Sequence, residues 1–503
     1  MNATPPLMRD DRPERAMSPP SPDLPAPLQE VAEYFDDFSK ESQGWRRKNR
    51  TYYRLIESIM TFVVPKGASV LEVGSAEGDL LAALEPSRGV GIDISEGMVE
   101  SGRERHPDLE FVREAGETFV RDETFDYVVL SDLVQMADDL LAIFRNALDM
   151  SHPETRLIVH SYSQAWKPII RLAEVLRLKP RKPIRNWVGP DDVRNLLNLA
   201  GFEVISLNRR ILMPKQVPLL TRFLNGYVAN IWPFSHFTLT FWIVARPFPT
   251  GERLETGVSV VCPCRNEEEM IERIVEEVPE MGTGTELVFV DDGSTDGTKA
   301  EIERQIALHP DRQITLVSQT GRGKATAVRS GFAVAKHDVL MILDADLTVR
   351  ADDLPRFYDV LVTRRGELVN GSRLVYGLEP GSMRFLNILG NKVFSIIYSN
   401  LLSQPVKDTL CGTKVLTRAN WHRIDAGRAY FGDFDRWGDF DLLLGAAKLN
   451  LKIVDLPVRY GARTAGESKM SRFRHGRLMF QMAAFAFSRL KAGPVRLSRR
   501  VAT

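Results

Sequence analysis

Residues 339–346 read Val-Leu-Met-Ile-Leu-Asp-Ala-Asp, an apolar run that ends in two carboxylates. The run predicts a strand from Val339 to Leu343 that is buried inside a sheet. Alternate residues of an extended chain point the same way, so Asp344 and Asp346 can converge on one divalent cation. Mg²⁺ or Mn²⁺ held there would bridge the two phosphates of a nucleotide and neutralise charge on a departing diphosphate. Asp-x-Asp triplets are common, so this assignment depends on the surrounding sequence.

A second strand that ends in carboxylates precedes this one. Residues 288–298 read Val-Phe-Val-Asp-Asp-Gly-Ser-Thr-Asp-Gly-Thr, so Asp291 and Asp292 follow an apolar run and precede a Gly-rich turn. Open α/β sheets bind ligands at the carboxyl ends of their strands, where a carboxylate can accept a hydrogen bond from a nucleobase N–H. The same residues also suit an Asx-turn and a helix N-cap without any ligand. The two motifs together favour a nucleotide site.

Strand-like and helix-like runs alternate along the whole chain, which predicts two α/β domains. The expected strands are Ser69–Val73, Gly89–Ile92, Glu110–Val112, Tyr127–Leu130 and Arg156–Ser161 in the first half, and Val258–Pro263, Glu286–Val290, Ile314–Val317 and Val339–Leu343 in the second. Residues 246–251, with two prolines and a glycine, favour a linker. The domains are therefore expected at 29–249 and 250–503, after a disordered Pro-rich tail at 1–28.

The composition of the chain gives no indication that it binds nucleic acid. The 503 residues include 66 Lys or Arg and 66 Asp or Glu, so the chain has no excess of positive charge that would attract a nucleic acid. Three cysteines are too few for a disulfide framework, and the N-terminus lacks the apolar core of a signal peptide. A cytoplasmic protein is expected.

One stretch bears on membrane insertion, because no Lys, Arg, Asp or Glu occurs between Arg222 and Arg246. That length is sufficient to cross a bilayer, but Pro233 and several polar residues interrupt it. Residues 237–244 first alternate and then become continuously apolar, as a sheet strand does. The pattern favours a closing pair of strands over a transmembrane helix.

In the first half, residues 70–79 read Val-Leu-Glu-Val-Gly-Ser-Ala-Glu-Gly-Asp, an apolar strand followed by a Gly-containing turn into a helix. Gly74 and Gly78 would permit close backbone approach to a ligand, and Asp93 at the end of the next strand can accept from ribose hydroxyls. A nicotinamide cofactor would suit this arrangement as well, and a turn without any ligand is a further alternative.

The second half resembles glycosyltransferase family 2, in particular the branch of the dolichol-phosphate mannose and glucose synthases. Beside the two carboxylate motifs, the matching segments are residues 262–268, 321–324 with Gly331, 371–373, 408–414 and 466–470. The resemblance implies a GT-A fold, a nucleotide-diphosphate sugar as donor, Mg²⁺ or Mn²⁺ as cofactor, and inversion at the anomeric carbon. No Gln-x-x-Arg-Trp motif of the processive polymerases occurs, so one sugar per turnover is expected.

The resemblance also assigns residues to the expected site. Asp344 and Asp346 would hold the metal, and Asp346, Asp408 and Asp441 are the catalytic candidates. Nucleotide-sugar contacts are expected from Pro263, Arg265, Glu267, Asp291, Asp292, Lys324, Asp344, Ala345 and Asp346. Acceptor-phosphate contacts are expected from Arg373, Arg384, Arg463, Ser468 and Lys469. Arginine suits that role because its planar fork binds phosphate bidentately.

Two classes of acceptor remain open. A polyprenyl phosphate is ionised near pH 7 and can attack unaided, whereas a glycan hydroxyl needs a positioned base such as Asp408, Asp439 or Asp441. Residues 472–491 combine aromatic and basic residues, which suits a helix that lies in a membrane interface and receives a lipid-linked acceptor. A helix packed on the core and a subunit contact are the alternatives. Peripheral binding at the cytoplasmic face of a membrane is therefore the expectation for a lipid acceptor.

The region from Tyr34 to Pro247 resembles the class I S-adenosylmethionine-dependent methyltransferases, which have a Rossmann-like fold. The match rests on the glycine motif, Asp93, and residues 114–117, 125–132 and 200–202. By that likeness the cofactor contacts are Glu72, Gly74, Gly78, Asp93, Glu114 and Ala115. The glycines would face the methionine part, Asp93 the ribose, and Glu114 and Ala115 the adenine. The usual middle glycine is Ala76 here, and no base for a methyl acceptor is evident.

The sequence thus predicts a bifunctional transferase that moves a sugar with one domain and a methyl group with the other. One alternative is a glycosyltransferase that acts on a glycan hydroxyl. Another makes the first half a non-catalytic module that binds S-adenosylmethionine or scaffolds a partner. Residues 466–469 match glycosyl transfer, which disfavours a nucleotidyltransferase.

Overall fold

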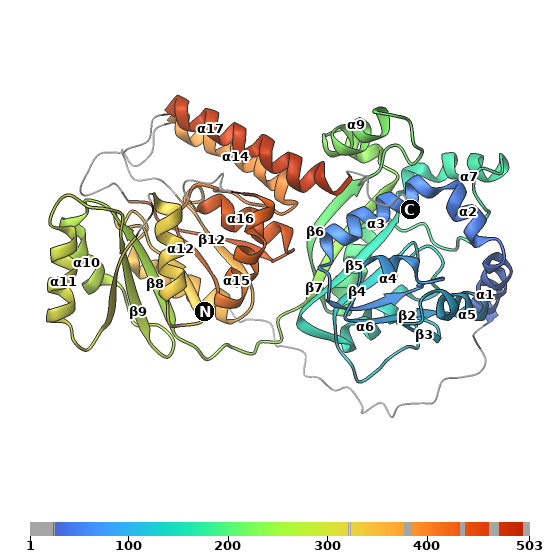
Figure 1. Ribbon diagram of the computed structural model, residues 1–503, viewed down its shortest axis with the longest axis horizontal. Helices are drawn as coiled ribbons and strands as arrows, with labels where there is room; N and C mark the ends of the chain where they lie inside the picture. The colour runs from blue at the N-terminus through green and yellow to red at the C-terminus, as the bar shows by residue number, and fades with distance from the viewer. Residues whose placement is uncertain are drawn as a thin grey trace.

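The structure, a computed structural model, describes residues 24, 26–319, 321, 323–376, 385–432, 438–461 and 472–495. Within them the chain forms two α/β domains that lie side by side (Figure 1), each built on a seven-stranded sheet. The first sheet ends with β7 (Thr240–Pro247) and the second begins with β8 (Val258–Cys264), so residues 248–257 join the two sheets, whereas Arg246 and Pro247 of the expected linker belong to β7. Most of the expected Pro-rich tail lies outside the described residues, and α1 begins at Ala26.

The first sheet has the strand order β3-β2-β1-β4-β5-β7-β6. Its strands are β1 (Ser69–Val73), β2 (Arg88–Asp93), β3 (Glu110–Arg113), β4 (Phe125–Ser131), β5 (Ser151–Tyr162), β6 (Phe202–Arg210) and β7. β1 to β5 run parallel, and β7 pairs antiparallel with β5 and β6. All five strands predicted in the first half are present, so the prediction of an α/β layer is confirmed here.

Helices cover both faces of this sheet. Alternate residues of β1 and β4 point to opposite sides, and the apolar residues on each side pack against helices. Leu71 and Val128 pack with α6 and α8, whereas Val70 and Val129 pack with α3 and α4. The α-helices are α1 (Ala26–Ser39), α2 (Ser42–Lys48), α3 (Arg50–Val63), α4 (Asp79–Ala83), α5 (Glu96–Arg105), α6 (Leu140–Asp149), α7 (Lys167–Val175), α8 (Pro190–Ala200) and α9 (Leu220–Gly226). The short helix η1 (Gln164–Trp166) precedes α7.

The stretch between Arg222 and Arg246, which has no Lys, Arg, Asp or Glu, does not form one long helix. It contains most of α9, then η2 (Val228–Asn230), η3 (Phe234–Phe237) and finally most of β7. β7 lies between β5 and β6, so the prediction of closing strands is confirmed. Within the described part of the chain, every helix is too short or too polar to cross a bilayer.

The second sheet has the order β10-β9-β8-β11-β13-β12-β14. Its strands are β8, β9 (Thr285–Asp291), β10 (Gln313–Ser318), β11 (Val339–Ile342), β12 (Leu368–Ser372), β13 (Lys414–Thr417) and β14 (Ile453–Pro457). β13 runs antiparallel to both of its neighbours, β11 and β12, so the carboxyl ends of β8, β9, β11 and β12 meet at one edge. The four predicted strands are confirmed, whereas the last three strands of the sheet were not predicted.

The helices of the second domain enclose this sheet in two apolar clusters. They are α10 (Glu268–Glu277), α11 (Thr298–Leu308), α12 (Lys324–Val334), η4 (Ala351–Asp353), α13 (Leu354–Val362), α14 (Phe385–Leu402), α15 (Arg418–Ala426), η5 (Arg428–Tyr430), α16 (Asp439–Lys448), α17 (Arg472–Ala486), η6 (Phe487–Lys491) and η7 (Gly493–Val495). α17 buries Met479, Met482 and Ala486 in the core, while Phe480 is 55% exposed. One face of the expected C-terminal amphipathic helix thus packs on the domain and another faces outward.

The two domains share a buried ionic contact. Arg156 of β5 is 1% exposed and donates two hydrogen bonds to Glu367, at 2.7 and 2.8 Å. Arg246 of β7 lies 3.4 Å from the same carboxylate and 2.6 Å from Glu203. Burial alone would raise the pKa of Glu367, but the two arginines hold it below its usual value. The junction therefore depends on charges that stabilise one another across the domain boundary.

Candidate active sites

The first candidate site lies at the carboxyl edge of the second sheet. Its members are Asp291 at the end of β9, Asp344 and Asp346 after β11, and Lys324 at the start of α12. Asp292 accepts the Gly323 N–H with both oxygens at 3.1 Å and also binds the side-chain amide of Gln319. The carboxylate after β9 therefore fixes the Gly-rich turn that begins α12.

Lys324 and Asp344 form the central ion pair, with Nζ 2.6 Å from Oδ1. Burial would lower the pKa of Lys324 and raise the pKa of Asp344, but their attraction reverses both shifts and keeps both groups charged. Gly412 packs against the pair, since a Cβ at this position would lie 2.1 Å from Asp344 Oδ2. A cation suited to phosphate thus lies beside a carboxylate expected to hold a metal.

The donor set at this edge suits a metal shared with a nucleotide. Asp346 Oδ1 accepts from the backbone N–H and the hydroxyl of Thr348, at 3.2 and 2.8 Å. Among the residues that the structure describes, no three His, Cys, Asp or Glu side chains gather closely enough to bind a metal by themselves. Enzymes commonly hold Mg²⁺ with one or two carboxylates and complete its coordination with substrate phosphates and water. Asp344 and Asp346 fit that mode of binding.

Asp408 is fully buried and its carboxylate is heavily engaged. Arg373 donates to it from Nε and Nη2 at 2.6 and 2.9 Å, and the N–H groups of Arg373 and Leu410 add bonds of 3.1 and 3.0 Å. Burial would raise the pKa of Asp408, but Arg373 and these hydrogen bonds hold it below its usual value. The geometry suits Asp408 to fix the guanidinium of Arg373.

The other two carboxylates considered as bases are also in ion pairs. Asp439 lies 3.0 Å from the buried ammonium of Lys414. Asp441 lies 3.3 Å from Arg329 and 3.4 Å from Arg428. It lines a separate cavity of about 30 Å³, whose walls do not include the carboxylates that follow β11. Each of these candidates is thus neutralised by a neighbouring cation.

The remaining predicted residues of this site lie in different settings. Pro263 belongs to β8, and Ala345 is buried. Arg265 is more than half exposed, 3.8 Å from Asp292, and the Glu267 N–H donates to Thr298. The residues Arg384, Arg463, Ser468 and Lys469 lie outside the described part of the chain.

The second candidate site is a cavity of about 180 Å³ in the first domain, lined by residues that end β1, β2 and β4. Of the predicted cofactor residues, Glu72, Gly74, Asp93 and Glu114 line it, whereas Gly78 and Ala115 do not. Gly78 has a φ of +72°, and a Cβ there would lie 2.3 Å from the Phe111 ring. Conformation and packing therefore require this glycine without any contact to a ligand.

Glu72 gives this cavity an affinity for positive charge. The residue is 3% exposed, burial raises its pKa to about 8, and Oε2 has no hydrogen-bond partner. An ionised buried carboxylate is costly unless a cation or donor compensates it. S-adenosylmethionine carries a sulfonium and an ammonium group, so its chemistry fits a wall that contains this acid.

Asp93 and Ala76 stabilise the turn after β1. The Ala76 N–H donates to Asp93 Oδ2 at 2.9 Å, and the Ser95 N–H donates to Oδ1 at 3.0 Å. Ala76 has a φ of +48°, in the region that glycine enters most easily. The turn therefore accommodates Ala76 in place of the family's middle glycine, and the hydrogen bond from its N–H to Asp93 supports the positive φ.

Local motifs do not reveal the side chains that close this cavity. Tyr53 of α3, Asp132 after β4 and Lys182 after α7 all line it. Tyr52 Oη donates to Asp132 Oδ2 at 3.1 Å, and Asp132 has a φ of +57°. The apolar spacing of α3 indicates a buried face, but it carries no signal of what that face contacts.

Two family models match separate parts of the chain. Glycosyl transferase family 2 matches residues 259–422, and a methyltransferase domain matches residues 45–207. The first match spans β8 to β13 and therefore includes Asp344, Asp346 and Lys324. The second match includes Glu72, Asp93 and Glu114.

Two curated relatives and one solved structure are examples of the individual proteins to which the chain is similar. An uncharacterized glycosyltransferase of Mycobacterium bovis is 32% identical over 219 residues, which are 43% of this chain and 90% of the relative. A dolichyl-phosphate hexose transferase of Haloferax volcanii is 28% identical over 224 residues, 44% of this chain and 89% of the relative. Among solved structures, a SAM-dependent methyltransferase of Thermotoga maritima covers 43% of this chain and 99% of its own, with 17% identity and a TM-score of 0.36.

Proposed function

Because the chain belongs to glycosyltransferase family 2, we propose that its second domain transfers one sugar from a nucleotide diphosphate to a polyprenyl phosphate. The acceptor oxygen attacks the anomeric carbon opposite the leaving diphosphate, so the configuration inverts. The observation that carries this proposal is the assembly of Asp344, Asp346 and Lys324 at the carboxyl edge of the second sheet. The methyltransferase domain fused before it would use S-adenosylmethionine as methyl donor.

The residues at this edge have complementary roles in donor binding. Asp344 and Asp346 would hold Mg²⁺ or Mn²⁺, which neutralises charge on the departing diphosphate. Lys324 places a second positive charge 2.6 Å from Asp344. Asp291 ends β9 and Asp292 follows it, two strands away from β11 at the same edge of the sheet, where a carboxylate can accept from a nucleobase. Pro263, Arg265, Glu267 and Ala345 complete the proposed donor contacts.

The charge state of the candidate bases favours a phosphate acceptor over a glycan hydroxyl. Asp408, Asp439 and Asp441 are each paired with a cation, and Arg373 holds the pKa of Asp408 below its usual value, which makes that carboxylate a weaker proton acceptor. A phosphate monoester is ionised near pH 7 and needs no base. Arg373 is proposed to bind it, together with Arg384, Arg463, Ser468 and Lys469. One relative named as a dolichyl-phosphate transferase supports this choice, and the reaction would take place at the cytoplasmic face of a membrane.

Assay of a panel of sugar nucleotides tests the glycosyltransferase proposal. With Mg²⁺ or Mn²⁺ and polyprenyl phosphate, we expect one donor to give a glycolipid, which mass spectrometry of the lipid extract identifies. Removal of the divalent cation with EDTA should abolish the product, since the donor phosphates would lose their neutralising charge. Donor hydrolysis without a glycolipid would move the acceptor to a glycan hydroxyl. Absence of both binding and turnover with every donor would contradict the proposal.

The first domain is expected to release a proton when it binds S-adenosylmethionine. With a pKa of about 8, Glu72 is mostly protonated at pH 7 in the free protein, and a cationic ligand favours its ionised form. Binding at pH 7 should therefore release close to one proton, and release should fade as the pH rises above 8 because Glu72 is then already ionised. Calorimetric titration in buffers of different ionisation enthalpy measures the number of protons.

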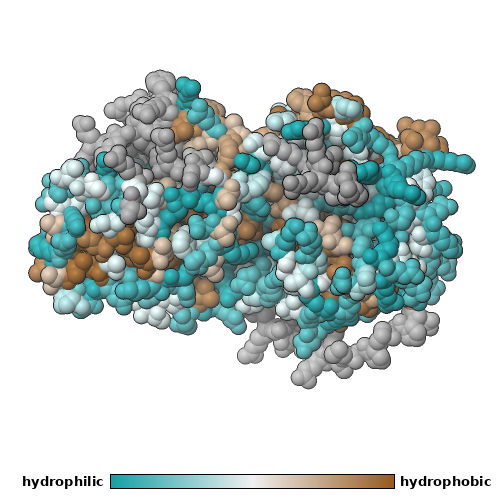
Figure 2. All heavy atoms as spheres, in the orientation of Figure 1, coloured by the Kyte–Doolittle hydropathy of each residue, from teal (hydrophilic) through white to brown (hydrophobic). Residues whose placement is uncertain are grey.

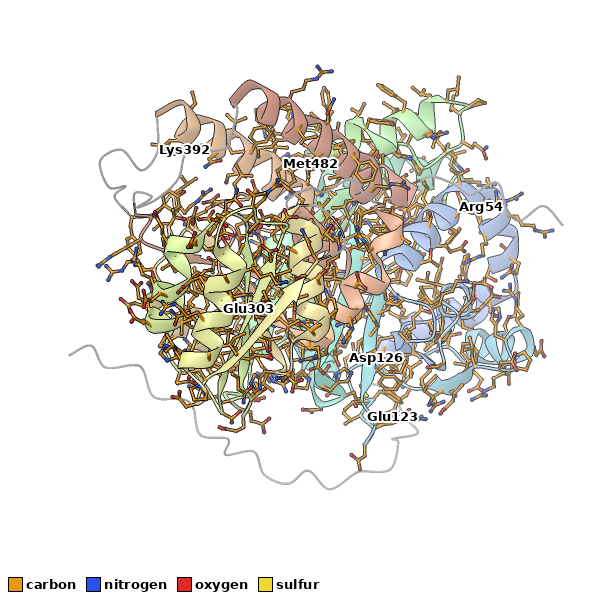
Figure 3. All side chains as sticks on the ribbon, turned by 60° about the vertical axis from the view of Figure 1, so that its left-hand side comes forward. Arg54, Glu123, Asp126, Glu303, Lys392 and Met482 are labelled. Carbon is orange, nitrogen blue, oxygen red and sulfur yellow. The ribbon has the colours of Figure 1, made fainter. Side chains whose placement is uncertain are left out.

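Two variants test whether Glu72 is the source of the released proton. Glu72→Gln should abolish the proton release and weaken binding by roughly tenfold or more, because the charge is removed. Glu123→Gln should change neither, since Glu123 pairs with Arg88 away from the cavity lining, at the lower edge of Figure 3. Binding without methyl transfer to any lipid or glycan would favour a non-catalytic module that senses the cofactor. No binding would favour a scaffold.

A further inference from the structure

Exposed apolar side chains are concentrated on one side of the molecule. Among the described residues, 25 large apolar side chains are exposed, and 18 of them lie in four segments: five in residues 167–178, nine in 217–237, three in 389–396, and Phe480. Figure 1 shows α7, α9, α14 and α17 along the same upper side, and Figure 2 shows apolar surface over α9. Single exposed apolar residues are ordinary, but a concentration of this kind marks an interaction surface.

The charge on these segments has one sign. Residues 167–182, 217–237, 385–402 and 477–489 contain six, one, one and two Lys or Arg, respectively, and Glu174 is their only acidic residue. The whole chain has equal numbers of basic and acidic residues, so the asymmetry is local. Figure 3 shows Lys392 of α14 on this side of the molecule. We refer to the surface formed by these four segments as the basic apolar face.

The basic apolar face is continuous across the domain boundary. The indole N–H of Trp166, next to α7, donates to the Phe237 carbonyl at 2.7 Å and ties α7 to η3. Tyr227, which follows α9, stacks on Phe487, which follows α17, with ring centroids 5.9 Å apart. α17 in turn packs along α14. Elements of the methyltransferase domain and of the glycosyltransferase domain therefore form one surface.

We propose that the basic apolar face binds an anionic lipid bilayer, so that the methyltransferase domain contacts the membrane directly. Trp232, Phe237 and Ile396 are 76%, 62% and 72% exposed, and aromatic and aliphatic side chains of this kind enter the interfacial region of a bilayer. Lys and Arg around them attract anionic head groups. Contact with a second copy would place like charges opposite each other, which is unfavourable. The uniform sign therefore selects an anionic lipid surface.

Segments of this face are connected along the chain to both candidate sites. The chain that leaves α7 reaches Lys182, which lines the methyl-donor cavity. In the second domain, α14 and α17 follow β12 and β14, whose parallel pairing directs their carboxyl ends to the edge that carries Asp344. The inference concerns lipid binding alone and does not depend on the sugar acceptor proposed above.

Vesicle flotation with the full chain, without donor or acceptor, tests this inference. The wild type is expected to float with vesicles of phosphatidylglycerol and phosphatidylcholine at low salt, and far less with phosphatidylcholine alone or at high salt. Val175→Glu combined with Phe237→Glu changes two exposed positions of the methyltransferase domain and should weaken binding by roughly a hundredfold. Ile396→Glu combined with Phe480→Glu should have a similar effect from the other domain.

The matched control combines Leu199→Glu with Leu308→Glu, two positions that are 61% and 56% exposed on α8 and α11, outside the face. It should float as the wild type does, and unchanged thermal unfolding shows that each variant is folded. Failure of the wild type to float, or flotation of the Val175 and Phe237 variant at the wild-type level, would overturn the inference. A dimer that these two substitutions dissociate, without flotation, would instead identify a contact between copies.

Discussion

Replacing Asp346 by asparagine is expected to reduce sugar transfer by about a thousandfold or more. Asparagine keeps the size of the side chain and the oxygen that Thr348 bonds, but it removes the charge that a divalent cation requires. Loss of several kcal/mol of stabilisation on the departing diphosphate corresponds to a factor of this size. Initial rates of transfer to polyprenyl phosphate, at saturating donor and metal, measure the effect.

Asp352→Asn is the matched control for this prediction. Its carboxylate lies in the same stretch of chain, is 76% exposed and pairs with Arg350 at the surface. It should keep the wild-type rate, and both variants should bind S-adenosylmethionine equally well because the first domain is unaltered. If Asp346→Asn kept more than roughly a tenth of the rate, the assignment of Asp346 to the metal would be wrong.

Both predicted folds are confirmed by the two sheets and by the family matches: a Rossmann-like methyltransferase domain and a GT-A glycosyltransferase domain. The predictable strands are those buried on both faces, such as 127–130 and 339–342, where helices on both sides require a continuous apolar run. β12 contains Asn370, which bonds to the Asp408 carbonyl and to Asp455 of β14. The pattern of apolar and polar residues along a segment does not indicate which distant residues will pair with it. For this reason β12, β13 and β14 were not predicted.

The candidate sites were predictable where one short segment fixes both backbone and chemistry. Gly74 and Asp93 belong to βα turns of the first sheet, and both line the cavity as the motif implies. Pairings between distant segments were not predictable. Tyr52 and Asp132 are 80 residues apart in the chain, and the role of Asp408 depends on Arg373, 35 residues away. A sequence motif can identify a carboxylate as a candidate site residue, but only the folded structure shows which cation forms an ion pair with it.

Replacing Glu367 by glutamine is expected to lower the free energy of unfolding by roughly 3–5 kcal/mol, the usual cost of removing one member of a buried ion pair. Arg156 would stay buried without the carboxylate that it now contacts at 2.7 and 2.8 Å. Arg246 would keep Glu203, so most of the loss arises at Arg156. Urea unfolding followed by the fluorescence of both domains measures the change. Glu277→Gln, which removes a half-exposed pair with Arg273, should leave the free energy almost unchanged.

The same contact should make the stability of the wild type sensitive to acid. Arg156 and Arg246 hold the pKa of Glu367 below its ordinary value against the effect of burial. A depressed carboxyl pKa contributes stability that is complete above the unfolded value of about 4.3 and is lost as the pH falls through the folded value. Glu367→Gln should lack this step. Because the arginines belong to the first sheet and Glu367 leads into β12 of the second, an unchanged acid transition would mean that the two domains are stable independently of this junction.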